Sequence, residues 1–241
     1  MIEVKPYKNA ESSKREQVEQ MFDSIAPKYD FLNRFLSLGI DQIWRRKAIN
    51  SLKEVSPKQI LDVATGTADL AIASLKLNPD HVTGIDISNQ MLEVGRVKIS
   101  DKNLNKKVTL QQADSANLPF NDNKFDAITV AFGVRNFEFL QQGINQMYRV
   151  TRKGGKLAVL EFSMPKSFPF KQFYNFYFKH ILPSWGAMIS KSKTAYTYLP
   201  ESVKHFPEGE QFAEYLKIAG YTNIKIRPLT FGICTLYTAI K

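Results

Sequence analysis

The segment from Gln59 to Asp86, QILDVATGTADLAIASLKLNPDHVTGID, constrains the fold more than any other part of the chain. Its apolar run at Ile60–Val63 is too short for a helix and too continuous for an exposed strand, so it predicts a buried parallel strand. A tight turn at Thr65–Thr67, a short helix at Leu70–Leu75 and a second strand at Val82–Ile85 follow. The segment therefore predicts a strand–helix–strand unit that ends in an acid.

Two residues of this unit indicate a ligand. Gly66 lies in the turn, where the backbone can approach a bound molecule because no Cβ stands in the way. Asp86 follows 20 residues later, the offset at which an acid accepts hydrogen bonds from ribose hydroxyls. The unit therefore predicts a site for a nucleotide-like cofactor. The alternative is a crossover that binds no ligand.

The glycine pattern distinguishes between cofactors. A dinucleotide site needs G-x-G-x-x-G so that a pyrophosphate can lie on the helix N-terminus, but Ala64–Asp69 contains one glycine, with Thr67 directly after it. Asp69 places a negative charge in the first turn of the helix, where it repels a diphosphate and attracts an α-amino group. This pattern favours S-adenosylmethionine over NAD. Ala68 stands where relatives often have glycine; this costs little if the residue is helical, whereas a positive φ there would weaken the interpretation.

Several separated segments together resemble one enzyme family, the menaquinone and ubiquinone C-methyltransferases. They run in the family's order from about Val18 to about Pro207: VEQMFDSIAPKYDFLNRFLSLGIDQIWRR, LDVATGTADL, GIDISNQML, ADSANLPF, FDAITVAFGVRNF, MYRVTRKGGKLAVLEFSMP and YLPESVKHFP. The resemblance implies an S-adenosylmethionine-dependent enzyme that methylates a ring carbon of a polyprenylated quinol.

The expected fold is the α/β fold of a class I methyltransferase: a Rossmann-like, mostly parallel, seven-stranded sheet with helices on both faces and an antiparallel C-terminal edge strand. We expect one domain over residues 1–241, with a helical N-terminal cap at 1–55 and an aromatic, basic substrate lobe at 163–205. We expect further helices at Asn89–Ile99, capped by Ser88, at Phe137–Val150 and at Gly209–Ala219. Further strands are expected at Val108–Gln111, Phe125–Ala131 and Lys156–Phe162, the last preceded by a turn at Gly154–Gly155. A hairpin of Thr222–Arg227 with Ile233–Ile240 is expected to close the chain.

Ligands of such sheets bind beyond the carboxyl ends of the strands. Asp114 and Ser115 follow the third strand and resemble the family's pair that contacts the adenine edge, although Asp114 can instead cap a turn. Ala131 ends the fourth strand at a position where relatives often have serine, so a backbone contact to the cofactor is expected there.

The loop Phe132–Phe137, FGVRNF, is the expected centre of the chemistry. Arg135 stays protonated, so it can stabilise a developing phenolate or position a water, and Asn136 can hold a quinol oxygen. Phe132 is expected to contact the substrate. The alternative is that Arg135 pairs with a carboxylate and Asn136 caps the following helix.

The segment APKYD provides two more candidates. The resemblance implies that it folds over the cofactor, with Tyr29 shielding the methionine end and Asp30 orienting the cofactor or transferring a proton, although packing and capping explain them equally well. Tyr177 and His180 of the lobe are expected to contact the substrate, and His180 can serve as a base if it faces the cavity.

Composition excludes several protein classes. The 241 residues are 44% hydrophobic and can bury a sizeable core. A single cysteine, Cys234, forms no intramolecular disulfide, and the chain shows no metal-ligand spacing, so we expect no metal. The polar N-terminus and the lack of a long apolar run predict a cytoplasmic protein.

The net charge of +10 indicates an anionic partner or surface. Between Phe162 and Pro200 the chain has five lysines, eleven aromatic residues and no acid. Such a segment can lie at a lipid headgroup boundary or stack on bases, and it can also be a lid over the active site. Peripheral contact with the inner face of the membrane is expected; no nucleic acid is expected, and oligomeric state is left open.

The function that fits best is conversion of demethylmenaquinol to menaquinol with S-adenosylmethionine as the methyl donor. The nearest alternative is ring methylation of 2-methoxy-6-polyprenyl-1,4-benzoquinol in ubiquinone synthesis. Hypotheses of other classes are an RNA methyltransferase, a nicotinamide oxidoreductase and a membrane-surface binding module without catalysis.

Overall fold

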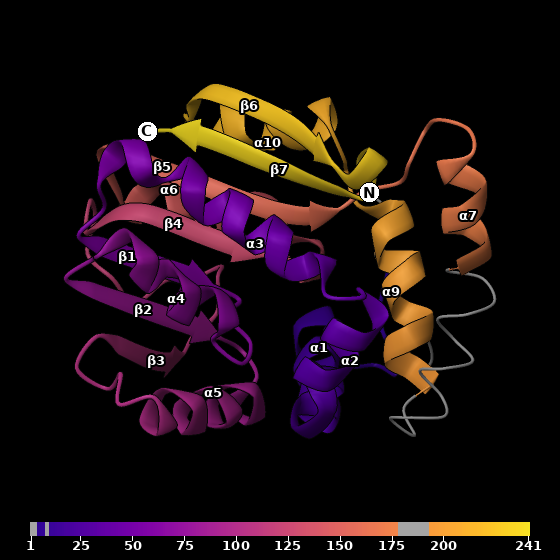
Figure 1. Cartoon of the computed structure of the whole chain (residues 1–241), viewed down its shortest axis with the longest axis horizontal. Helices are drawn as coiled ribbons and strands as arrows, with labels where there is room; N and C mark the ends of the chain where they lie inside the picture. The colour runs from indigo at the N-terminus through magenta and orange to yellow at the C-terminus, as the bar shows by residue number, and fades with distance from the viewer. Residues whose placement is uncertain (1–3, 8–9, 178–192) are drawn as a thin grey trace.

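A computed structural model describes residues 4–7, 10–177 and 193–241. Figure 1 shows a twisted seven-stranded sheet with helices on both faces and a group of helices beside one end of it. The strand order is β3-β2-β1-β4-β5-β7-β6. The strands are β1 (Gln59–Val63), β2 (His81–Asp86), β3 (Val108–Gln112), β4 (Phe125–Ala131), β5 (Thr151–Phe162), β6 (Thr222–Leu229) and β7 (Cys234–Ile240).

The first five strands are parallel, and the chain order reverses between β1 and β4. This reversal is the point at which doubly wound sheets bind ligands. The C-terminal hairpin completes the sheet, with β7 antiparallel to both β5 and β6. The mostly parallel class I fold predicted from the sequence is therefore confirmed.

Two apolar layers cover the sheet because its strands are hydrophobic on both faces. One face packs against α3 (Ile40–Ser51), α4 (Asp69–Ser74) and α5 (Asn89–Asp101), and the other packs against α6 (Leu140–Val150) and α10 (Glu210–Ala219). Ser88 caps α5 by accepting a hydrogen bond from the Met91 N–H, as predicted.

The remaining helices form a third apolar cluster at one end of the sheet. It combines α1 (Lys14–Ile25), α2 (Tyr29–Leu36) and α9 (Lys193–His205), with Met91 of α5 as its contact to the sheet layer. The first 55 residues are helical from Lys14 onward, but α3 packs on the sheet rather than with this cluster. The lobe also contains α7 (Phe170–Phe176); His180 and Trp185 lie outside the described residues.

Two local predictions were wrong. The turn expected at Gly154–Gly155 is a bulge inside β5, where the pairing with β4 shifts between Thr151 and Lys156 and Gly154 takes a φ of 75°. The helix expected from Phe137 begins at Leu140, because a short 3-10 turn precedes Phe137 and that residue has an extended ψ of 132°.

Candidate active site

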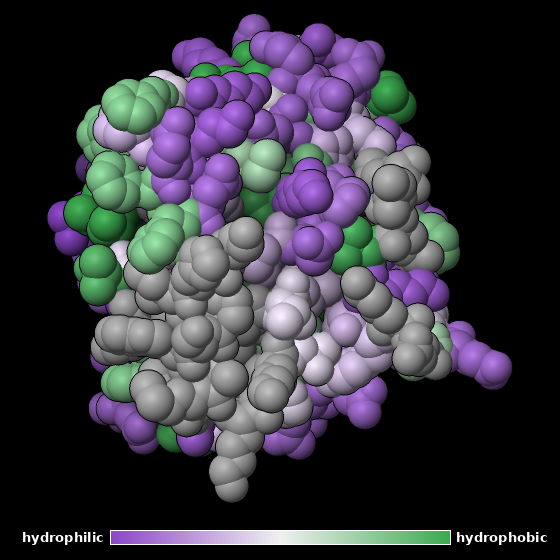
Figure 2. Space-filling view, turned by 90° about the vertical axis from the view of Figure 1, so that its right-hand side faces the viewer, coloured by the Kyte–Doolittle hydropathy of each residue, from purple (hydrophilic) through white to green (hydrophobic). Residues whose placement is uncertain are grey.

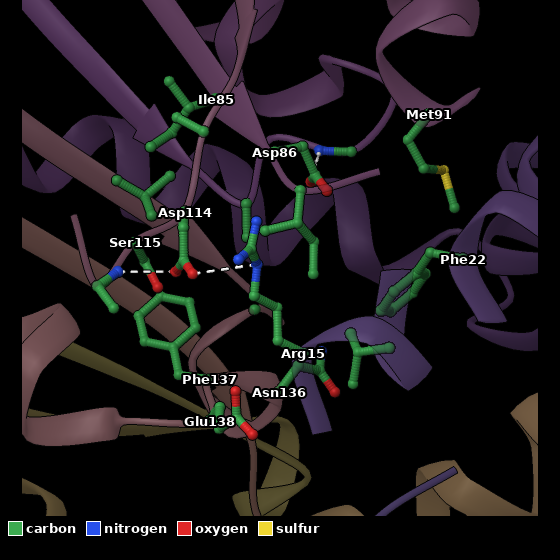
Figure 3. Close-up of a pocket in the computed structure, with 18 of the residues that line it drawn as sticks. Arg15, Phe22, Ile85, Asp86, Met91, Asp114, Ser115, Asn136, Phe137 and Glu138 are labelled. Atoms are coloured by element: carbon green, nitrogen blue, oxygen red, sulfur yellow. Dashed lines mark hydrogen bonds and ion pairs between the residues drawn. The ribbon is translucent and has the colours of Figure 1, made fainter. Parts of the chain in front are cut away.

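A cavity lies beyond the carboxyl ends of β1, β2 and β4. Figure 3 shows that strand-end residues form one side of it and that side chains of α1 and α5 face them. Its lining includes Arg15, Val18, Phe22, Tyr29, Gly66, Asp86, Met91, Asp114, Ser115, Ala131, Phe132, Asn136 and Phe137. Seven of the predicted cofactor and catalytic positions therefore share one cavity: Tyr29, Gly66, Asp86, Asp114, Ser115, Ala131 and Asn136.

Asp86 is held rigidly by the backbone around it. Its Oδ2 accepts a hydrogen bond from the Gly66 N–H at 2.8 Å, and its Oδ1 accepts one from the Ser88 N–H at 3.0 Å. Burial raises the pKa of this carboxyl to about 6, although these N–H donors act in the opposite direction. Each carboxylate oxygen can accept a second hydrogen bond, so both remain able to bind ribose hydroxyls.

Asp114 lies across the cavity and has two partners in this structure. Its Oδ1 accepts a hydrogen bond from the Ala116 N–H at 2.8 Å, the turn-capping contact that the sequence left open. Its Oδ2 lies 3.2 Å from Nε of Arg15, which reaches over from α1 (Figure 3). Ser115 is buried next to it. The structure thus adds Arg15 to the predicted adenine end of the site.

The turns after β1 and β4 contain unusual backbone. Ala64, Ala68 and Phe132 all have positive φ, at 53°, 65° and 60°. Ala68 is not helical but precedes α4 as its N-cap, so the condition that weakens the glycine-pattern argument for the cofactor is met. The two turns also touch, because a Cβ added to Gly133 would lie 2.5 Å from the Ala64 Cβ. Each such residue costs about 1–2 kcal/mol, and such strain concentrates at functional sites.

The outer side of the β1 turn carries a charged cluster. Lys98 of α5 lies 2.5 Å from Asp30 Oδ2 and 2.7 Å from Asp69 Oδ1, and it also donates to the Thr67 hydroxyl. Thr67 in turn donates to Asp30 Oδ1 at 2.5 Å. Asp69 and Thr67 line a smaller cavity that adjoins Gly66, whereas Asp30 lines none of the three cavities.

Asp62 is a buried acid at the end of β1 on the same small cavity. It accepts hydrogen bonds from the hydroxyls of Thr65 and Thr129, both at 2.6 Å. Burial raises the pKa of its carboxyl to about 6.

A second, apolar cavity adjoins the first. Phe22, Tyr29 and Phe132 line both cavities and form the boundary between them. The Tyr29 ring lies above the cofactor turn, since a Cβ on Gly66 would lie 3.9 Å from it. The rest of the apolar lining comes from the helical cluster and the lobe, including Met21, Leu32, Leu38, Tyr174, Tyr177, Tyr198 and Leu199.

Stacked aromatic rings form the floor of this second cavity. Phe132 stacks on Phe162 at 4.5 Å between ring centroids, and Trp44 packs against both. The Trp44 indole N–H donates to the Thr230 hydroxyl at 2.8 Å, which fixes its orientation. The guanidinium of Arg45 lies over Phe132 at 5.8 Å. This surface suits a flat aromatic ring.

Arg135 and Asn136 meet at the boundary, as their sequence neighbourhood predicts. Arg135 lines the apolar cavity and Asn136 lines the first cavity. Arg135 also forms an ion pair with the buried Glu161, with Nη1 and Oε1 2.8 Å apart. Asn136 does not cap the following helix, because α6 begins after Phe139 without a side-chain cap.

The sequence analysis missed Arg15, Trp44, Lys98 and Glu161. Glu161 was detectable in principle, since it is an acid at the end of a predicted buried strand. Lys98 and Trp44 lie on helices whose sequences carry no signal of what they face. No cluster of His, Cys, Asp and Glu that could hold a metal occurs among the described residues.

Comparison with known proteins identifies the family. Residues 10–241 match the ubiE/COQ5 methyltransferase family. The chain belongs to this family. The enzyme is thus an S-adenosylmethionine-dependent methyltransferase, as predicted.

Named members of the ubiE/COQ5 family resemble this chain over nearly its whole length. It is 52% identical to a demethylmenaquinone methyltransferase of Bacteroides fragilis, over 99% of this chain and 97% of the relative. It is 45% identical to a ubiquinone/menaquinone biosynthesis C-methyltransferase of Geotalea daltonii, over 95% and 98%. A putative S-adenosylmethionine-dependent methyltransferase structure from Methanococcus maripaludis shares the fold, with a TM-score of 0.61, 21% identity and coverage of 98% and 96%.

Proposed function

We propose that this enzyme methylates a ring carbon of demethylmenaquinol to give menaquinol. The observation that carries the proposal is the pair of adjoining cavities, one lined in part by acids and the other apolar, which share Phe22, Tyr29 and Phe132. A polar cofactor and an oily quinol need such a pair. The name of the Bacteroides fragilis relative supports the choice of ring.

The first cavity fits S-adenosylmethionine. Gly66 has a φ of 56° and no Cβ, so its backbone can lie against the ligand, and Asp86 presents its remaining lone pairs for the ribose hydroxyls. Asp114 and Ser115 would hold the adenine edge, and Ala131 would contribute its backbone. The small cavity beside Thr67 and Asp69 would receive the amino acid end, with Tyr29 as its cover.

The apolar cavity would hold the quinol ring against Phe132 and Phe162, with the start of the prenyl tail among the residues of the helical cluster and Tyr177. Leu38 lines this cavity and is 84% exposed, which places an opening of the cavity at the protein surface. A long tail can leave there. The proposed contact of His180 with the substrate falls on a residue outside the described ones.

Bound S-adenosylmethionine supplies an electrophilic methyl group on a sulfonium. The methyl group would pass from this sulfur to the ring carbon, with S-adenosylhomocysteine as the leaving group, and the ring carbon would then lose its proton to water. Arg135 would stabilise negative charge on the quinol oxygen, which activates the ring carbon, and Asn136 would orient the same edge of the ring. Asp30, which is bound to Thr67 and Lys98, would act through the cofactor turn rather than at the ring.

Purified enzyme, S-adenosylmethionine and demethylmenaquinol with a short prenyl tail test the proposal. We expect a product heavier by one methyl group on a ring carbon, identified by mass spectrometry and NMR. Parallel reactions contain 2-methoxy-6-polyprenyl-1,4-benzoquinol and total RNA. The name of the Geotalea daltonii relative covers ubiquinone synthesis, so faster turnover of the benzoquinol would favour that alternative. Methylation of RNA alone would refute both quinol assignments.

We also propose that the enzyme contacts the membrane through its lobe. No helix among the described residues is long and apolar enough to cross a bilayer. Figure 2 shows hydrophobic residues exposed on the face that carries the lobe. Phe168 and Phe173 are 81% and 69% exposed, and the neighbouring Lys166 and Lys171 are exposed as well. Each such lysine contributes about 1 kcal/mol of attraction to anionic lipid.

Co-sedimentation with vesicles tests this contact. We expect binding to anionic vesicles at low salt, weaker binding to neutral ones, and a loss of binding in K166E/K171E. The control K102E/K106E makes the same charge change at exposed lysines after α5. Equal recovery of the wild type in the supernatant with both vesicle types would refute the contact.

A further inference from the structure

Two neighbouring residues at the boundary of the cavities each leave one buried polar atom without a partner. Nε of Arg135 and Oδ1 of Asn136 have no hydrogen-bond partner among the described residues. The Arg135 side chain is 8% exposed and Asn136 is 9% exposed. Buried polar atoms nearly always have a partner, so an unpaired donor and an unpaired acceptor on adjacent residues point to a ligand group that both accepts and donates a hydrogen bond.

A phenolic hydroxyl is such a group. Its oxygen can accept from the Arg135 Nε–H, and its hydrogen can be donated to Asn136 Oδ1. Because Asn136 lines the first cavity and Arg135 lines the second, the hydroxyl would lie where a ring in the apolar cavity meets a methyl donor in the other. This step rests on the proposed function.

Glu161 determines which atom of Arg135 is presented. It is completely buried at the end of β5, and its carboxylate accepts hydrogen bonds from the Arg135 backbone N–H at 3.2 Å and from Nη1 at 2.8 Å. Nη1 also donates to the Phe132 carbonyl. The guanidinium is therefore anchored through Nη1, so Nε takes no part in the contacts with Glu161 and Phe132. The guanidinium carbon lies 5.5 Å from the centre of the Phe162 ring.

We propose that Glu161 is the positioning residue of the reaction. It orients Arg135 so that Nε–H, together with Asn136 Oδ1, binds one quinol hydroxyl, and its charge balances that of Arg135. A neutral pair lets a neutral quinol bind in an apolar cavity. The phenolate that forms there is then stabilised by the nearby guanidinium without an excess of buried positive charge.

The two members of the pair make opposite predictions for the pH dependence of kcat. E161Q leaves an unbalanced positive charge beside the quinol. We therefore expect the apparent pKa of the quinol hydroxyl, measured from the acidic limb of the plot of kcat against pH, to fall by about one unit or more. R135Q leaves an unbalanced negative charge, so the same limb moves to higher pH. In both variants kcat at pH 7.5 falls at least about tenfold, while KM for S-adenosylmethionine changes less than about threefold.

Two further variants separate positioning from folding. E161D keeps the negative charge. We therefore expect the acidic limb of its kcat–pH profile to lie where that of the wild type lies, and its kcat to exceed that of E161Q. In the double variant R135Q/E161Q the pair is again neutral, so we expect the acidic limb of its kcat–pH profile to return toward the wild-type position although kcat stays low. If E161Q does not fold, this double variant provides the test. The matched control is E54Q, which removes the acid paired with Lys156 near the middle of β5 and should leave kcat and its pH dependence unchanged.

Shifts of the limb in the same direction in E161Q and R135Q, or no shift in either, would overturn the proposal. The proposal would also be overturned if the acidic limb of R135Q/E161Q lay at the same pH as that of R135Q. Failure of the proposed function is distinguishable, because then the wild type itself does not methylate demethylmenaquinol.

Discussion

Oδ2 of Asp86 accepts a hydrogen bond from the backbone N–H of Gly66 at 2.8 Å, which joins the end of β2 to the turn after β1. The two residues are 20 positions apart, and the parallel pairing of β1 with β2 brings them together. The turn and the acid are therefore set in position before any ligand binds. Preorganisation of this kind lowers the entropy that binding must overcome.

Replacement of Asp86 by asparagine should weaken cofactor binding about 10- to 100-fold. Asparagine removes the charge and half of the acceptor sites, and a hydrogen bond to a charged group contributes about 1.5–3 kcal/mol. Calorimetric titration with S-adenosylhomocysteine measures the effect. D80N, an exposed acid just before β2, serves as the control and should bind normally. Equal affinities of D86N and the wild type would rule out the assigned role of Asp86.

Cofactor affinity should also depend on pH through the same carboxyl. Burial raises the pKa of Asp86 to about 6, so protonation below that pH removes acceptor sites from the ribose end. We expect the dissociation constant of S-adenosylhomocysteine to be constant between pH 7 and 8 and to rise up to tenfold per unit below about pH 6. Titrations at pH 5, 6 and 7.5 test this. D86N should show a much flatter profile.

Asp62 should lower stability at neutral pH. Its folded pKa of about 6 exceeds the ordinary value of 3.8, so between these values the folded state binds more protons than the unfolded state and stability falls as pH rises. The full cost, on the order of 3 kcal/mol, applies above pH 6. D62N should therefore gain stability relative to the wild type between pH 4.5 and 7.5 in urea unfolding. A difference that does not change with pH would contradict this.

The sequence predicted the fold well, and the residues that it proposed for the cofactor line one cavity, for a physical reason. Buried parallel strands, the glycine turn and the acid at a fixed offset are local patterns, and the sheet topology then fixes where their ends meet. Asp86, Asp114 and Ala131 were found in this way. The expected cofactor turn itself was less accurate, because the positive φ of Ala68 has no signature in an alanine.

Contacts between distant elements were not predictable from spacing. Glu161 meets Arg135 across 26 positions and Lys98 meets Asp30 across 68, and each pairing depends on how a helix or a loop packs. The same limit applies to Asp69. Its charge was expected to attract the α-amino group of the cofactor, but in this structure it forms an ion pair with Lys98.

Replacement of Lys98 by methionine should destabilise the cofactor turn. The change leaves Asp30 and Asp69 close together without the cation between them, and we expect a loss of about 1–2 kcal/mol in the free energy of unfolding at pH 7.5. High salt should reduce the loss, because dissolved ions screen the repulsion between the two acids. K102M, at an exposed position after the same helix, should change stability little. A loss that does not change with salt concentration would indicate a packing effect instead.

Gly133 should be required for the close approach of the two strand-end turns. Its φ of −108° is open to any residue, so the cost of G133A comes from the added Cβ, which would lie 2.5 Å from the Ala64 Cβ. We expect G133A to lose stability and cofactor affinity together. A64G removes the opposing Cβ and also relieves the positive φ of that residue, so alone it should be close to neutral.

The double variant A64G/G133A decides whether that contact is the cause. If the two Cβ atoms clash, the double variant regains most of the stability and affinity lost in G133A, measured by thermal unfolding and by titration with S-adenosylhomocysteine. The two single effects then fail to add, as expected for residues in direct contact. Additive losses would show that Gly133 is needed for another reason, such as its second contact with Val130.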